Sequence, residues 1–133
     1  MKALRFAVPL AYMAAIYALS SIPDTQTDPA NLAEQALQWT PPTLQNLLHI
    51  PLYGGLAVSW YWALLTAKSA SQATRLLLMV ALTIAYGVYD EVHQLSVPGR
   101  YGSVTDLILN TIGALVAAAL IAMREKPTRP QPD

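Results

Sequence analysis

The chain has 133 residues, enough for one domain; 54% of them are apolar, 12% are charged, and the mean hydropathy is +0.35. Because a soluble domain carries about 25% charged residues, this composition indicates a protein that lies in a membrane. The eight basic and eight acidic residues cancel, so the chain lacks the basic surface typical of nucleic-acid-binding proteins. Cysteine is absent, which excludes disulfides, thiolate metal sites and thiol nucleophiles.

Four apolar segments follow one another along the chain, at residues 4–21, 47–65, 76–94 and 104–123. Each approaches the ~20 residues that a helix needs to cross a hydrocarbon core of ~30 Å. A helix also satisfies its own backbone hydrogen bonds, as lipid requires. We therefore expect an all-α fold, an integral membrane four-helix bundle formed by residues 1–123.

The first segment has one feature of a signal peptide, because Lys2 and Arg5 precede its apolar run. The run ends in "SSIPDT" without a clear small-residue cleavage pattern. Three further apolar segments follow, so we interpret it as a retained membrane helix. In the second segment, Pro51 is expected either to begin the helix or to kink it.

The connection between the first two segments, residues 22–46, contains a further helix signal. Asp28-Pro29 has the pattern of an N-cap followed by proline in the first turn. This pattern predicts a short interfacial helix through residues 29–39, with Trp39 as its anchor at the lipid headgroups. At the other end of the chain, residues 124–133 are polar and are expected to form a cytoplasmic tail.

Basic residues are concentrated in alternate connections. Lys2 and Arg5 lie at the start of the chain, before or at the beginning of the first segment. Lys68 and Arg75 lie between the second and third segments, and Arg124, Lys126 and Arg129 follow the fourth. Arg100 is the remaining basic residue and lies between the third and fourth. Loops rich in lysine and arginine stay in the cytoplasm. We therefore expect both termini to be cytoplasmic and the connection that carries Arg100 to face outward.

The polar residues of the segments gather at the outward end. On the third segment Asp90, His93 and Gln94 are expected to share one helix face, with Glu91 rotated by about 100°. On the fourth segment Asp106, Asn110 and Gly113 form another stripe, and on the second His49 and Tyr53 are four residues apart. We expect these stripes to meet in one outward pocket, whose candidate ligand-binding residues are His49, Tyr53, Asp90, Glu91, Gln94, Arg100, Asp106 and Asn110, with Ser20, Ser21 and His93 as secondary candidates.

Several of these residues also have ordinary structural interpretations. Ser103-Val104-Thr105-Asp106 is a capping-box pattern, so Asp106 either caps the fourth helix, serves the pocket, or does both. His49 is equally well explained by a hydrogen bond between membrane helices. The acids at residues 90 and 91 could stand in interfacial water, but two adjacent acids make it hard for both to avoid the protein interior.

The segment "DEVHQLSVPGRYGSVTDLILNTIGA" resembles the signature of the VanZ-like membrane proteins. The residues that match in order and spacing are Asp90, Glu91, Gln94, Pro98, Gly99, Arg100, Asp106, Asn110 and Gly113, together with His49 and Tyr53 in the second segment and Ser20, Ser21 and Pro23 at the end of the first. The resemblance covers about residues 5–120 and implies a small multi-pass protein of the bacterial cell membrane. The family's founding member is associated with low-level resistance to the glycopeptide teicoplanin. One position departs from the family pattern, because Gln45-Asn46 stands where an Asp-Lys pair often precedes the histidine.

Four functions are compatible with this pattern. The first is a binding protein that recognises a cell-envelope component, either a lipid headgroup or a lipoglycopeptide, with Arg100 gripping a phosphate or carboxylate. The second is a membrane-embedded hydrolase that uses metal or acid-base chemistry on a lipid-linked substrate, although only two histidines exist and no H-E-x-x-H spacing occurs. A small transporter and an accessory structural subunit are the others.

Of these functions the sequence favours binding. The partners expected are therefore membrane lipid and an envelope lipid or glycopeptide ligand, with no resident metal or cofactor. The glycines of the second segment, Gly54 and Gly55, leave room for a homodimer.

Overall fold

The computed structural model describes residues 2–24 and 32–124 of the chain. These ranges contain no strand and five helices: α1 (Lys2–Ser20), α2 (Leu32–Trp39), α3 (Pro42–Leu64), α4 (Gln72–Gln94) and α5 (Val104–Arg124). The expected all-α fold with four packed helices is confirmed, and the short α2 lies within the predicted interfacial helix. The expected cap at residues 28–29 and the tail from residue 125 lie outside the described residues.

Local sequence explains where the helices begin and continue. The Ser71 side chain caps α4 by accepting a hydrogen bond from the Thr74 amide at 3.1 Å. Pro42 occupies the first turn of α3, where its missing N–H costs nothing, whereas Pro51 lies inside the helix and does not begin it. The last turns of α4 include the polar residues 90–94, so the helix continues beyond its apolar part.

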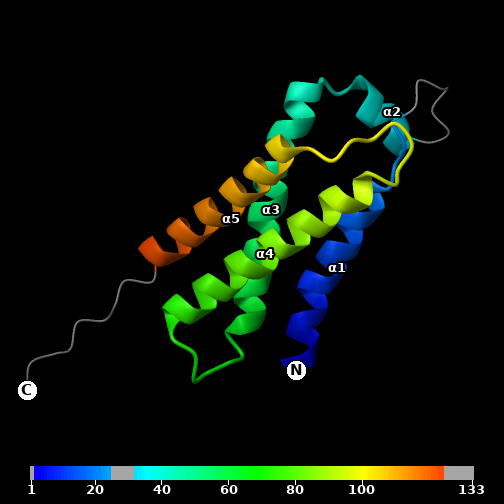
Figure 1. The fold of residues 1–133 in the computed structure, drawn as a ribbon. Coiled ribbons are helices and arrows are strands. Elements are labelled where there is room, and N and C mark those ends of the chain that lie inside the picture. The colour runs from blue at the N-terminus through cyan, green and yellow to red at the C-terminus, as the bar shows by residue number, and fades with distance from the viewer. Residues whose placement is uncertain (1, 25–31, 125–133) are drawn as a thin grey trace, which may run out of the picture.

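The helices alternate in direction. Figure 1 shows α2 and the connection of residues 95–103 at one end of the bundle, with the beginning of α1 and the link between α3 and α4 at the other. We call these the polar end and the basic end, because Arg100 is the only basic residue of the first while Arg5, Lys68 and Arg75 lie at the second. At the basic end the Arg5 guanidinium lies 5.0 Å from the centre of the Trp62 ring, a cation–π contact between α1 and α3.

Helix α3 is central, since it packs against α1, α4 and α5. Its closest approach is to α5, where Gly54 faces Gly113. A Cβ atom on Gly113 would collide with the Ile50 carbonyl oxygen and would lie 3.0 Å from the Gly54 amide nitrogen. Small residues thus allow the two backbones to meet, as in packed membrane helices. The core on either side is formed by two clusters, one of Ala57, Tyr61, Met79, Ala114 and Ala117 and one of Ile16, Tyr53, Leu56 and Tyr86.

The helices suggest a membrane protein. Among the described residues, α4 and α5 are long and apolar enough to cross a membrane, and Leu4–Ser20 forms a shorter apolar helix. Helix α3 is as long as α4, 23 residues, but its first turns carry polar side chains. Large apolar side chains also point outward, among them Leu77 at 70% and Leu120 at 52% exposure, as lipid contact would favour.

The contact between α3 and α5 gives a first prediction. Gly113→Ala should lower the stability in detergent by about 1 to 3 kcal/mol, because the new methyl group forces the two backbones apart. Gly54→Ala is the matched control, since its Cβ would lie 3.3 Å from the Gly113 carbonyl oxygen and needs only a small adjustment. Thermal unfolding of the three proteins measures the difference. An unchanged melting temperature for Gly113→Ala would show that the helices are farther apart than described.

Candidate functional site

The polar end of α4 is buried among the other helices. Asp90 is 1% exposed, Gln94 4% and Glu91 7%, because this face of α4 packs against both α3 and α5. Ionisable side chains within membrane helices are costly and normally have a defined partner or role. The partners of these residues therefore show what the arrangement does.

Only one of the two carboxylate oxygens of Asp90 has a hydrogen bond among the described residues. The hydroxyl of Tyr53, a fully buried residue of α3, donates a hydrogen bond to Asp90 Oδ2 at 2.9 Å. The other carboxylate oxygen, Oδ1, is buried and has no hydrogen-bond partner among the described residues. An ionised carboxylate accepts hydrogen bonds at both oxygens, so Asp90 retains capacity for a further donor.

His49 and Asn110 join α3 to α5. His49 Nδ1 lies 2.8 Å from Asn110 Oδ1. The amide oxygen can only accept, so Nδ1 donates and Nε2 of the neutral ring remains an acceptor. The amide nitrogen of Asn110 is buried and has no hydrogen-bond partner in the part of the chain that the structure describes. The absence of a side chain at Gly87 makes room for this contact, since a Cβ there would lie 3.3 Å from both Asn110 Nδ2 and the Tyr53 ring.

Glu91 connects the end of α4 to the beginning of α5. Its Oε2 accepts a hydrogen bond from the Ser103 amide at 2.7 Å, and the Ser103 hydroxyl accepts one from the Asp106 amide at 3.2 Å. In a capping box the acid three residues after the cap would accept the first of these bonds. Here Glu91 takes that position, and Asp106 Oδ1 is buried without a described partner. The capping interpretation is therefore correct for Ser103 and wrong for the Asp106 carboxylate.

Arg100 is positioned by the connection between α4 and α5. Its Nε donates to the Ile22 carbonyl at 3.1 Å, and the Asp24 amide donates to the Pro98 carbonyl at 3.1 Å. Gly99 has φ +77°, a conformation that favours glycine, and a Cβ there would collide with the Asp24 carbonyl oxygen. The connection is thus attached to the end of α1.

These elements line an open cavity of about 180 Å³ at the polar end. It is lined by Ile16, Leu19, Ser20, Thr40, Gln45, Asn46, Leu48, His49, Leu52, Asp90, Gln94, Arg100 and Asp106. Five of the eight main candidates line it. The other three, Tyr53, Glu91 and Asn110, lie behind this lining and bind Asp90, Ser103 and His49 respectively.

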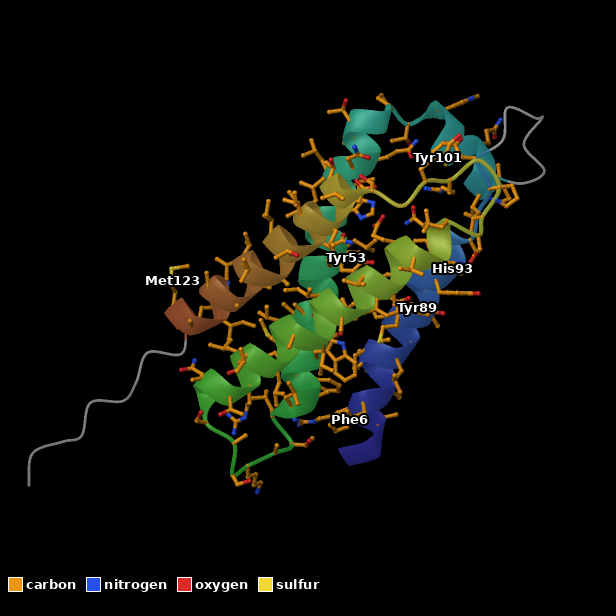
Figure 2. The ribbon with its side chains drawn as sticks, in the orientation of Figure 1. Phe6, Tyr53, Tyr89, His93, Tyr101 and Met123 are labelled. Carbon is orange, nitrogen blue, oxygen red and sulfur yellow. The ribbon has the colours of Figure 1, made fainter. Side chains whose placement is uncertain are left out.

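His93 lies outside the cavity, contrary to the expectation that it shares a face with Asp90 and Gln94. Its ring stacks on Tyr17, with 4.3 Å between ring centroids, and its Nε2 lies 2.9 Å from Ser21 Oγ. Figure 2 shows His93 and Tyr89 on the side of α4 nearest α1. The helical period explains the error, because the buried face is centred between residues 90, 91 and 94 and places residue 93 at its edge.

The Ser21–His93 contact is structural. Ser21 Oγ also lies 2.6 Å from the Tyr17 carbonyl oxygen and donates its one proton there. His93 Nε2 is therefore the donor to Ser21, which excludes this tautomer as the base of a serine nucleophile. The pair joins α1 to α4. Among the described residues, no group of three or more His, Asp or Glu side chains is arranged to hold a metal ion.

Sequence reasoning missed the part of the lining contributed by α3 and by Thr40, which lies between α2 and α3. Thr40, Gln45 and Asn46 add hydroxyl and amide groups, and Leu48 and Leu52 add apolar surface. Extending the helical period backward from His49 to Gln45, and forward to Leu52, would have identified this face. Gln45 and Asn46, the residues that depart from the resembled pattern, therefore lie at the cavity itself.

A family model described as VanZ/LLP1 matches residues 5–124 of the chain, nearly all of it. The match includes the described helices, except the first three residues of α1, and the segment 90–113. No significant match is found among curated proteins or among solved structures.

The different bonding of the two acids gives a second prediction. Glu91→Ala should lower the stability in detergent by about 1 to 3 kcal/mol, because it leaves the Ser103 amide without its partner. Asp106→Ala removes a carboxylate that no described hydrogen bond engages and should stay within about 0.5 kcal/mol of the parent. Parallel thermal unfolding measures both variants. Equal losses would show that the Asp106 carboxylate serves the fold.

Proposed function

The chain belongs to the VanZ/LLP1 family, and on this premise we propose that it is a membrane protein whose polar cavity binds a component of the cell envelope. The component is either a lipid headgroup or a lipoglycopeptide. One observation carries the proposal: Asp90 and Asp106 line a cavity, and each has a buried acceptor atom without a hydrogen-bond partner among the described residues. Buried polar groups are normally paired, so these atoms indicate a ligand that supplies the missing donors.

The charges around the cavity support binding of a polar ligand. Arg100 lines the cavity together with Asp90 and Asp106, so both signs of charge are present. A planar guanidinium suits phosphate and carboxylate groups, and carboxylates suit ammonium and hydroxyl groups. The Tyr53, Asn110 and Glu91 contacts fix the surrounding helices before any ligand arrives, which reduces the entropy lost on binding.

We further propose that the polar end faces the cell exterior. Arg5, Lys68, Arg75 and Arg124 lie at or beyond the helix ends opposite the cavity, and positively charged connections stay in the cytoplasm. The cavity would then be open to the outer leaflet and to envelope components outside the membrane.

Cysteine labelling tests this orientation, because the natural chain contains no cysteine. Ser96→Cys places a thiol on the exposed connection at the polar end, and Ser69→Cys places one on the exposed link between α3 and α4. In intact cells a membrane-impermeant maleimide should label Ser96→Cys, and Ser69→Cys should react only after permeabilisation. The reverse pattern would place the cavity in the cytoplasm.

Replacement of Arg100 tests binding. Arg100→Lys keeps the charge but removes the planar fork, so a ligand anion should be held about ten-fold more weakly. The protein would be extracted from vesicles of bacterial polar lipids, and retained lipid would be measured by native mass spectrometry. A parallel titration with teicoplanin covers the second ligand class.

Arg75→Lys is the matched control, because Arg75 also donates to one backbone carbonyl, that of Ala67, but lies at the basic end. It should bind as the parent does. If Arg100→Lys and Arg75→Lys both retain the parent's ligand in full, while melting at the parent's temperature, Arg100 does not contact a ligand.

A further inference from the structure

We infer that the ligand of this cavity is the headgroup of a membrane lipid that joins a primary ammonium to a phosphate, and that it enters sideways between α1 and α3. This inference rests on the proposed function and selects one chemical class within it. It is carried by the volume of the cavity, by the position of its apolar wall, and by the kind of hydrogen bond that its polar residues lack.

The volume favours a headgroup over a lipoglycopeptide. The cavity measures about 180 Å³. Sites for drug-sized ligands measure about 300 to 1,000 Å³, and a lipoglycopeptide, with several sugars and aromatic rings, is larger still. A phosphate bearing a short amino-alcohol is of the right size.

The apolar wall of the cavity reaches the outer surface of the bundle. Leu19 of α1 and Leu48 of α3 line the cavity, yet they are 48% and 51% exposed. Ile16 lies deeper on the same side and is 2% exposed. The lining therefore changes from leucines at the lipid-facing surface to charged residues at the inner end. An amphiphile whose chains lie along the leucines would place its headgroup among the charges.

Two acceptor atoms at the charged end of the cavity lack hydrogen-bond donors among the described residues. Asp90 Oδ1 and Asp106 Oδ1 have no described partner, and in the neutral His49 ring Nε2 is an acceptor when Nδ1 donates to Asn110. A primary ammonium carries three N–H donors, whereas a trimethylated ammonium carries none. The unpartnered acceptors thus select the primary amine, and Arg100 is the basic residue of the lining that suits its phosphate.

Binding requires local movement, because Asp90 Oδ1 and Asp106 Oδ1 are both shielded in the structure. The lining must open at Asp90, and the Asp106 carboxylate must turn toward the ligand. No described hydrogen bond engages the Asp106 side chain, because Glu91 has replaced it at the Ser103 amide. Its turn therefore breaks no described hydrogen bond.

Two lipids that differ only in their amine provide the test. The protein would be incorporated in separate vesicles containing phosphatidylethanolamine or phosphatidylcholine with identical acyl chains in the same matrix lipid, and retained lipid would be measured by native mass spectrometry. Phosphatidylethanolamine should be retained about ten-fold better, because only it supplies charge-assisted N–H donors. Asp106→Asn should reduce that preference, and Arg100→Lys should weaken retention of both lipids.

Asp24→Asn is the control, because it removes an exposed acid at the same end whose side chain does not line the cavity; it should leave the preference unchanged. Equal retention of both lipids, or a stronger retention of phosphatidylglycerol, overturns this inference and leaves the proposed function intact. Binding of teicoplanin with no lipid retained also overturns this inference and leaves the proposed function intact. If no lipid is retained and teicoplanin does not bind, both proposals fail.

Discussion

The hydrogen bond from the Ser103 amide to Glu91 Oε2 determines much of the arrangement at the polar end. It joins the last turn of α4 to the first turn of α5 and therefore fixes the path of the connection that carries Arg100. A buried carboxylate at the amino terminus of a helix is also favoured by the helix dipole, which compensates part of the cost of burying Glu91. Because Glu91 completes the cap of α5, no described hydrogen bond of the fold engages the Asp106 carboxylate.

The polar residues form two layers with different tasks. Tyr53, Glu91 and Asn110 lie behind the cavity and bind neighbouring groups of the protein. Asp90 and Asp106 line the cavity, and among the described residues each has one buried oxygen without a partner, as Glu91 also has behind them. Supporting residues of this kind fix the orientation of the groups in front of them, which is what a selective binding site requires.

The sequence predicted the helices well because their apolar segments are long and their ends carry polar or proline-rich connections. It also predicted which residues gather at the polar end, since periodicity and alternation of direction determine that placement. It failed where two side chains compete for one partner. The capping pattern of residues 103–106 is a local signal. It cannot reveal that Glu91, twelve residues earlier, accepts the hydrogen bond of the Ser103 amide in place of Asp106. Likewise the face shared by Asp90 and Gln94 depends on how α4 is rotated against its neighbours, and that rotation placed Glu91 inside and His93 at the edge.

The depth of the acids bears on the kind of function that the cavity supports. Asp90 lies four residues before the end of α4, or about 6 Å along the helix axis, whereas coupling carboxylates of transporters lie near the midplane between two alternating openings. The glycine contact of α3 with α5 lies farther toward the basic end, with no acid among the residues that form it. Movement of a polar ligand past this contact would require the most closely packed pair of helices to separate. The cavity is therefore better suited to hold a group from one leaflet than to pass it to the other.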